Sequence, residues 1–138
     1  PFQTKDKVLK LFVYEICRSL YLRFSRELNF KGIPAYEYRA ASELLQSIEQ
    51  NPNNQCFCAD PGQGLKNFCD VRGALRIFPC KSGMPIVLAL PHYFQASQRY
   101  HDEVDGMEPD AEKHEISLVL EPVETSVLNS VYNTKIFP

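Results

Sequence analysis

Residues 51–94 read NPNNQCFCADPGQGLKNFCDVRGALRIFPCKSGMPIVLALPHYF and contain four of the chain's five cysteines. The stretch begins with turn-forming residues at 51–54, crosses a Gly/Pro-rich loop at 60–64 and ends in the apolar run 84–90. So many cysteines in one stretch indicate either a disulfide framework or a metal site, and we favour disulfides, which form in oxidising compartments. The four are Cys56, Cys58, Cys69 and Cys80.

The spacing of these cysteines is unlike that of a structural zinc site. Such sites use C-x(2–4)-C knuckles, whereas the first pair here is C-x-C and the other two cysteines stand alone. Cys56 and Cys58 point to the same side of an extended chain, so they need different partners. We pair Cys58 with Cys69, across the Gly/Pro loop. We pair Cys17 with Cys80, which leaves Cys56 without a partner in this sequence. The alternative to a disulfide framework is that the cysteines are buried free thiols of a cytosolic protein.

The composition indicates one globular domain without a nucleic-acid footprint. At 138 residues and 44% hydrophobic content, the chain is long enough to bury a core. The formal net charge is −2 and there is no Lys/Arg block, so we expect no nucleic-acid partner. No apolar run approaches the roughly 20 residues of a membrane-spanning helix. From its length we expect residues 1–138 to form a single domain. Because the chain opens without methionine, we expect it to be a fragment of a larger protein.

The clearest structural pattern is the alternation of apolar and polar residues over Leu20–Lys31, which predicts a half-buried antiparallel strand. Only Arg26 interrupts its apolar face. Gly32 permits a turn, and Ile33–Arg39 returns as a second strand, so the two predict a hairpin. The apolar face of the first strand would carry Leu20, Leu22, Phe24, Leu28 and Phe30, and that of the second Tyr36 and Tyr38.

The remaining elements predicted are short strands and short helices. The helices would be capped by Ser42, with Leu44, Leu45 and Ile48 on one side, and by Ser97, with Tyr100 and Val104 before a stop at Gly106. The strands would be Lys7–Val13, Gly73–Phe78, Ile86–Leu90 and His114–Glu121. We therefore predict a mainly β chain with short helices, of the α+β class.

The three histidines form no catalytic motif. The stretch HEISL at residues 114–118 lacks the second histidine of H-E-x-x-H, and neither G-x-S-x-G nor a phosphate-binding loop occurs. His92 follows the buried strand, where a hydrogen-bonded role is expected, and His101 and His114 stand beside acidic residues. We therefore expect neither enzymatic activity nor a cofactor or metal.

Five stretches carry a resemblance to a known family. They are ICRSLYLRF (16–24), KGIPAYEYR (31–39), NPNNQCFC (51–58), CKSGMPIVLALPHYFQAS (80–97) and VDGMEPDAEKHEISLVLEP (104–122). Their order and cysteine placement resemble the C-terminal half of the ectodomain of the class B scavenger receptors. That family includes the platelet glycoprotein IV fatty-acid translocase, the lysosomal integral membrane proteins and the insect sensory neuron membrane proteins.

The resemblance implies an antiparallel β-barrel with a hydrophobic tunnel, in a glycosylated ectodomain anchored by flanking membrane segments that are absent here. It implies an extracellular position at the plasma membrane or a luminal one in the lysosome. It also implies disulfides Cys17–Cys80 and Cys58–Cys69, with Cys56 bonded to an upstream cysteine. Two features depart from the family: residues 123–138 diverge from its pattern, and no N-x-Ser/Thr sequon occurs.

The resemblance thus implies a receptor that binds and transfers lipids, fatty acids or lipoproteins through an apolar tunnel. An ectodomain that escorts or adheres to a glycoprotein partner is the alternative, and a small zinc-binding protein is a further one. The residues expected to line the tunnel, if they are not simply closed core, are Leu20, Leu22, Phe24, Ile86, Leu88 and Leu90.

Overall fold

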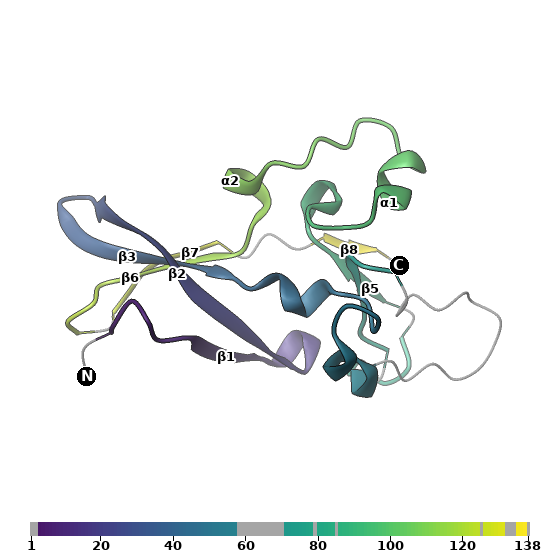
Figure 1. Cartoon of the computed structure of the whole chain (residues 1–138), viewed down its shortest axis with the longest axis horizontal. Helices are drawn as coiled ribbons and strands as arrows, with labels where there is room; N and C mark the ends of the chain where they lie inside the picture. Colours follow the sequence, from purple (N-terminus) through teal and green to yellow (C-terminus); the bar gives the residue numbers. More distant parts are fainter. Residues whose placement is uncertain are drawn as a thin grey trace. The chain divides into compact units, whose positions relative to one another are not determined.

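The computed structural model describes residues 3–57, 71–78, 80–84, 86–124, 126–131 and 135–137. The chain divides into two compact units, each with its own antiparallel sheet (Figure 1). The predicted mainly β class with short helices is confirmed for the described residues. The predicted Cys58–Cys69 pair lies outside the described residues. The first unit is Pro1–Tyr14, Arg18–Ala41 and Glu115–Tyr132, and the second is Glu15–Cys17, Ser42–His114 and Asn133–Pro138.

The first unit is a five-stranded sheet in the order β1-β2-β3-β6-β7. All neighbouring strands are antiparallel, and the long β2–β3 hairpin is visibly twisted (Figure 1). Its strands are β1 (Leu9–Val13), β2 (Arg18–Phe30), β3 (Ile33–Ala40), β6 (Ser117–Leu120) and β7 (Val127–Val131). The strands predicted from the alternating patterns are therefore present.

The β2–β3 hairpin turns through two residues, Lys31 and Gly32. Both have positive φ, 50° and 90°, which is the backbone of a type I′ turn. The side-chain oxygen of Asn29 accepts a hydrogen bond from the backbone N–H of Gly32 at 2.7 Å. This turn matches the right-handed twist of the flanking strands, and it confirms the hairpin predicted at Gly32.

A bulge in β2 overturns the prediction of one continuous apolar face. Phe24 pairs with Tyr38 and Arg26 pairs with Glu37, so Ser25 is an extra residue without a partner in β3. Residues paired across antiparallel strands share a face, and the bulge therefore moves every later residue of β2 to the other face. Leu28 and Phe30 consequently lie on the face opposite to Leu20, Leu22 and Phe24.

The core of the first unit lies on the face that carries Phe24. Leu22 and Tyr38 are completely buried there, and Leu118 and Leu120 of β6 pack with them. The register explains the grouping, because Tyr38 lies opposite Leu118. Partly buried hydrophobic residues surround this cluster: Leu9, Leu11, Phe24, Tyr36 and Ala40.

The second unit is built on a three-stranded antiparallel sheet in the order β4-β5-β8. Its strands are β4 (Ala74–Arg76), β5 (Val87–Ala89) and β8 (Lys135–Phe137). Successive residues Leu88 and Ala89 are both buried, which confirms that β5 is covered on both faces. The divergent residues 123–138 nevertheless supply β7 to the first sheet and β8 to the second.

Short helices fill the connections. They are the 3-10 turns η1 (Tyr14–Ile16), η2 (Ser42–Leu45), η3 (Pro52–Phe57) and η5 (Pro91–Tyr93), and the α-helices α1 (Gln98–Asp102) and α2 (Ala111–His114). Within the described ranges, every helix is too short or too polar to span a membrane.

Three predicted elements have a boundary that is wrong by three residues or more. Ser42 is the first residue of η2 rather than a cap, and this 3-10 turn stops at Leu45. Ser97 is the N-cap of α1, but its side chain makes no capping hydrogen bond and the helix ends at Asp102, before Val104. The strand expected from His114 begins only at Ser117, because α2 continues through His114.

Gly73 lies close against the backbone of Ala96 in the second unit. Its φ is 112°, and a Cβ at this position would lie 2.1 Å from the Cβ of Ala96. The N–H of Gly73 donates to the carbonyl of Leu45 at 2.9 Å, and the N–H of Ser97 donates to the carbonyl of Arg72 at 2.9 Å. Only glycine fits a position that combines this conformation with such close contact.

Candidate functional site

Three of the predicted wall residues lie together on the core face of the first unit. Leu20 and Leu22 of β2 are 3% and 0% exposed, so both belong to the packed core. Phe24 is partly buried and packs at the edge of the Leu22 cluster. Of these three positions, Phe24 is therefore the one that can still contact a ligand.

Aromatic rings gather around Phe24. Its ring centroid lies 5.4 Å from that of Tyr36 and 6.1 Å from that of Tyr38, both in edge-to-face geometry. The hydroxyl of Tyr38 donates to the carbonyl oxygen of Thr4 at 3.2 Å. Burial raises the pKa of Tyr38, because the phenolate would lose hydration there.

Lys5 covers this aromatic group, a role that the sequence analysis missed. Its Nζ lies 5.7 Å from the ring centroid of Phe24 and 5.8 Å from that of Tyr36, and it forms an ion pair with Glu27. Glu27 reaches this face because the bulge at Ser25 reverses the alternation. The hydrogen bond to Glu27 raises the pKa of Lys5.

The other predicted wall residues lie in and beside β5 of the second unit. Leu88 and Leu90 are both buried, at 7% exposure. Ile86 is partly exposed, and its carbonyl accepts a hydrogen bond from the N–H of Ile77 at 3.2 Å. Among the wall residues predicted in the second unit, Ile86 is therefore the one that is partly exposed, as Phe24 is among those of the first unit.

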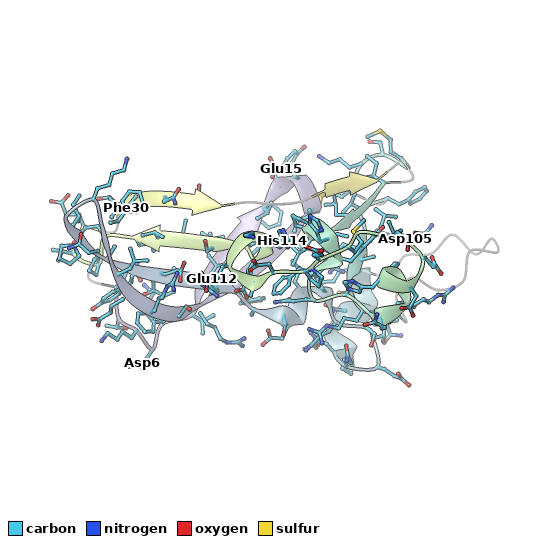
Figure 2. The ribbon with its side chains drawn as sticks, turned by 90° about the horizontal axis from the view of Figure 1, so that it is seen from above. Asp6, Glu15, Phe30, Asp105, Glu112 and His114 are labelled. Carbon is cyan, nitrogen blue, oxygen red and sulfur yellow. A yellow bond between two sulfur atoms is a disulfide. The ribbon has the colours of Figure 1, made fainter. Side chains whose placement is uncertain are left out.

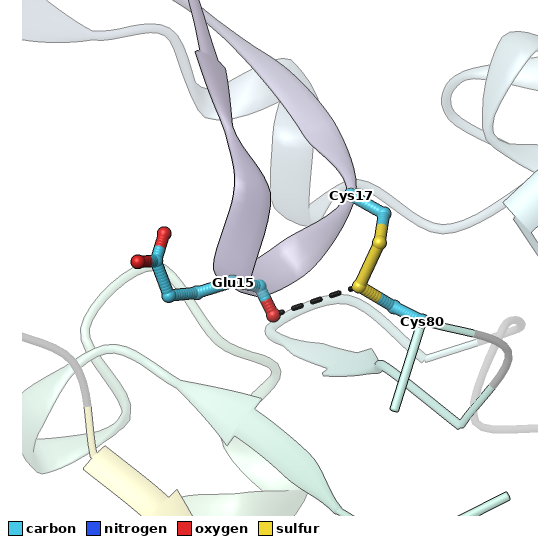
Figure 3. Close-up of a disulfide and its surroundings, with 3 residues drawn as sticks. All are labelled: Glu15, Cys17 and Cys80. Carbon is cyan, nitrogen blue, oxygen red and sulfur yellow. Dashed lines mark hydrogen bonds between the residues drawn. A yellow bond between two sulfur atoms is a disulfide. The ribbon is translucent and has the colours of Figure 1, made fainter. Parts of the chain in front are cut away.

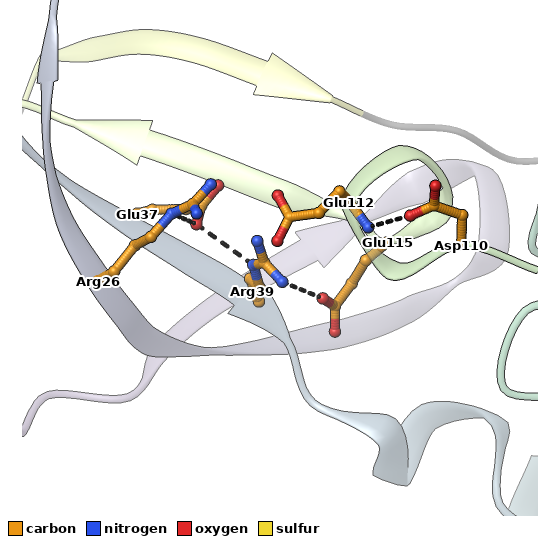
Figure 4. A network of polar contacts seen from close by, with 6 residues as sticks. All are labelled: Arg26, Glu37, Arg39, Asp110, Glu112 and Glu115. Carbon is orange, nitrogen blue, oxygen red and sulfur yellow. Dashed lines mark hydrogen bonds and ion pairs between the residues drawn. The ribbon is translucent and has the colours of Figure 1, made fainter.

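The opposite face of the first sheet carries a charged network (Figure 4). The carboxylate of Glu37 is almost fully buried and accepts from Arg26 at 2.8 Å and from Arg39 at 3.3 Å. Arg39 also contacts Glu115 at 3.0 Å. Buried charges need such partners, and this network supplies them beside the buried Ala35 and Val119 of the same face.

The predicted disulfide between Cys17 and Cys80 is present, with a Cα–Cα distance of 5.7 Å (Figure 3). The Sγ of Cys80 lies 3.7 Å from the carbonyl oxygen of Glu15. Because Cys80 is bonded to Cys17, it cannot be the fourth ligand of the zinc site considered from the sequence. Cys56 is an exposed free thiol within this chain.

Two histidines that looked unrelated in sequence lie together in the second unit. The rings of His92 and His114 are stacked, with centroids 4.5 Å apart and planes 12° from parallel. His92 accepts a hydrogen bond through Nδ1, as expected for a residue at a strand end. Among the described residues, no group of three or more His, Cys, Asp or Glu side chains could hold a metal ion. Neither histidine is therefore placed as a metal ligand there.

Comparison with known proteins identifies relatives along nearly the whole chain. Lysosome membrane protein 2 of Homo sapiens is 34% identical over 130 residues, which is 94% of this chain and 26% of the relative. Sensory neuron membrane protein 2 of Drosophila melanogaster is 34% identical over 118 residues, or 83% of this chain and 21% of the relative. The corresponding protein of Manduca sexta is 35% identical over 124 residues, or 89% and 24%.

The chain thus spans about a quarter of the length of the curated relatives that it matches. These relatives are membrane proteins by name, which agrees with the localisation that the resemblance implied. The family model named CD36 family matches residues 1–136. The match extends beyond Pro122, where the resemblance seen in the sequence ended. The chain therefore belongs to the CD36 family, the class B scavenger receptor family that its sequence motifs resembled.

Proposed function

We propose that this chain is part of the extracellular or luminal ectodomain of a membrane-anchored scavenger receptor that binds and transfers lipids. In this proposal, residues 1–138 are one domain of a larger ectodomain, and ligands pass through an apolar tunnel closed by the rest of the protein. Its action is binding rather than covalent chemistry.

The observation that carries the proposal is the apolar face of the five-stranded sheet. Its centre is a closed cluster, and its edge keeps the partly exposed aromatic residues Phe24 and Tyr36. Each methylene of an acyl chain buried on such a face contributes about 0.8 kcal/mol, so a long chain can be held without covalent steps. The family relationship supports the same reading.

Bulky substitutions at the two partly exposed wall positions test the proposal. Phe24→Trp and Ile86→Trp enlarge side chains that still have free surface, so they should obstruct an acyl chain before they disturb the core. We expect about tenfold weaker binding of a fluorescent long-chain fatty acid to the full chain, with little change in the melting temperature measured by circular dichroism.

Tyr21→Trp is the matched control. Tyr21 lies in the same strand but on the opposite face, where it is 47% exposed. This substitution should leave both fatty-acid binding and melting unchanged. If Phe24→Trp lowers binding and melting temperature together, the residues form closed core only and the tunnel wall is not where we place it.

Exposed aromatic residues support protein binding as the second candidate function. Phe12 of β1 is 66% exposed, and it shares a face with Tyr21 because its partner Ser19 lies two residues before Tyr21. Exposed aromatic pairs are enriched where proteins meet partners. Loss of partner capture by the Phe12→Ser variant, with fatty-acid binding intact, would favour this function over lipid transfer.

A further inference from the structure

His92 and His114 both accept hydrogen bonds from the backbone of residues 108–110. The Nδ1 of His92 accepts the N–H of Glu108 at 3.2 Å, and the Nδ1 of His114 accepts the N–H of Asp110 at 2.9 Å. Between these two donors lies Pro109, which has no backbone N–H. The two stacked imidazoles therefore accept hydrogen bonds from the two amides that flank Pro109, in the connection between α1 and α2.

This geometry requires both rings to be neutral. A nitrogen that accepts a hydrogen bond has no proton, so each neutral ring carries its proton on Nε2. Protonation at Nδ1 would set a ring N–H against a backbone N–H and break the contact. Protonation of both rings would also place two like charges at a centroid separation of 4.5 Å.

The charged groups around the pair do not replace the lost hydrogen bonds. The carboxylate of Asp110 accepts the N–H of Glu112 at 2.8 Å (Figure 4). It also pairs with Lys113 at 3.3 Å. The hydrogen bond from Glu112 lowers the pKa of Asp110, which stays ionised in mild acid and attracts a charged His114. Lys113 opposes that charge.

Three further acidic residues belong to this neighbourhood. Glu108 donates its backbone N–H to His92, and Glu112 lies with His114 on α2 (Figure 2). Glu115, the residue after His114, has its carboxylate bound by Arg39. A carboxylate can accept a backbone N–H, but the carboxylate of Asp110 is already bound by Glu112 and Lys113, and that of Glu115 by Arg39.

The backbone that carries His92 is strained independently of the ring pair. His92, Tyr93 and Gln95 have positive φ values of 52°, 51° and 61°, a region that residues other than glycine rarely adopt. Such conformations persist only where surrounding contacts hold them. Backbone hydrogen bonds close this turn, from the N–H of Tyr93 to the carbonyl of Leu90 at 3.0 Å and from the N–H of Phe94 to the carbonyl of Pro91 at 3.1 Å. The ring of Tyr93 also stacks on Tyr100 with centroids 5.2 Å apart, and the ring of His92 stacks on His114.

We propose that His92 and His114 form a pH-sensitive clip that holds the amides of Glu108 and Asp110 at neutral pH and releases them in mild acid. Protonation removes the two Nδ1 acceptors, so the amides of Glu108 and Asp110 lose their hydrogen-bond partners. The clip is a property of this chain, so it stands whether or not the chain transfers lipid.

Hydrogen exchange on the full chain tests the clip directly. The amides of Glu108 and Asp110 should be protected at pH 7.5 and lose about tenfold or more of that protection at pH 5, after correction for intrinsic exchange. In the asparagine double variant His92→Asn/His114→Asn, each Oδ1 takes the place of Nδ1 as an acceptor that does not titrate. Its protection should be the same at both pH values.

His101→Asn is the matched control, because His101 lies in α1 and accepts a hydrogen bond from neither amide. In this variant, protection of the Glu108 and Asp110 amides should fall at pH 5 as in the unchanged chain. Equal protection at both pH values in the unchanged chain would overturn the proposal. So would a pH dependence that survives in a folded double variant. If that variant does not fold, nitrogen NMR of the unchanged chain decides: both rings must show the Nε2–H form at pH 7.5, and an Nδ1–H form refutes the clip.

Discussion

The guanidinium Nε of Arg26 lies 2.8 Å from a carboxylate oxygen of Glu37 and forms an ion pair with it, on the face of the sheet opposite to Phe24. In the amino-acid sequence, Arg26 interrupts an apolar alternation. The bulge at Ser25 resolves that conflict, because it sends Arg26 to the polar face and brings Glu27 to the core face beside Lys5. A charged residue in an otherwise regular alternation is thus a sequence signal for a β-bulge.

Removal of the buried carboxylate should destabilise the first unit. Glu37→Gln keeps the size of the side chain but removes the negative charge that Arg26 and Arg39 share, so we expect a loss of about 1–3 kcal/mol in the free energy of unfolding. Urea denaturation measures it. Glu27→Gln is the control: its pair with Lys5 is solvent-exposed, and its effect should be smaller. Equal effects would show that burial of Glu37 is unimportant.

Two glycines should respond differently to the same substitution. Gly73→Ala places a Cβ 2.1 Å from Ala96, where backbone also lies close, so we expect a loss of about 3 kcal/mol or more, or failure to fold. Gly32→Ala meets no atom within 4 Å and pays only for its positive φ, about 1 kcal/mol. Chemical denaturation of both variants checks the order, and a more stable Gly73→Ala than Gly32→Ala would contradict the packing described.

Loss of the disulfide should weaken the chain strongly. Cys17 and Cys80 are separated by 63 positions, and in the chain-entropy model a loop of that size contributes about 4 kcal/mol. The double variant Cys17→Ser/Cys80→Ser should therefore melt well below the unchanged chain, whereas Cys56→Ser should have little effect within this chain because that thiol is free.

Peptide mapping without reduction extends this prediction to the complete protein. We expect the linked pair Cys58–Cys69, and a link from Cys56 to an upstream cysteine, in addition to Cys17–Cys80. A free Cys58 or Cys69 in the folded, complete protein would refute the three-disulfide arrangement.

Alkaline pH should destabilise the first unit through Tyr38. Burial raises its pKa above the ordinary value for tyrosine, about 10, so the folded state binds the phenolic proton more tightly than the unfolded chain. This contribution is complete below pH 10 and is lost as the pH rises through the folded pKa. Tyr38→Phe should reduce the fall in melting temperature above pH 10, while Tyr14→Phe, at a 75% exposed side chain, should not. An identical fall in both variants would exclude Tyr38 as a source.

The hairpin and the sheet strands could be predicted because their determinants are local. The alternation around Leu20 and Leu22 and the turn glycine Gly32 specify strand and turn from neighbouring residues alone. Wrong helix boundaries, such as the expected cap at Ser42, arose because short 3-10 turns depend on packing more than on capping residues. Candidate wall residues were found as apolar positions, but apolarity alone could not separate the fully buried Leu22 from the partly exposed Phe24.

By itself, the sequence determined the β-rich class, the hairpin, the Cys17–Cys80 pairing and the family, since each depends on local pattern or on ordered motifs. Only the tertiary structure decided which face each side chain occupies beyond Ser25, because one unpaired residue reverses the whole alternation. It also brought His92 to His114 and Lys5 to Phe24. Those contacts join residues far apart along the chain, and no local pattern encodes which distant side chains will meet once the sheets and turns have packed.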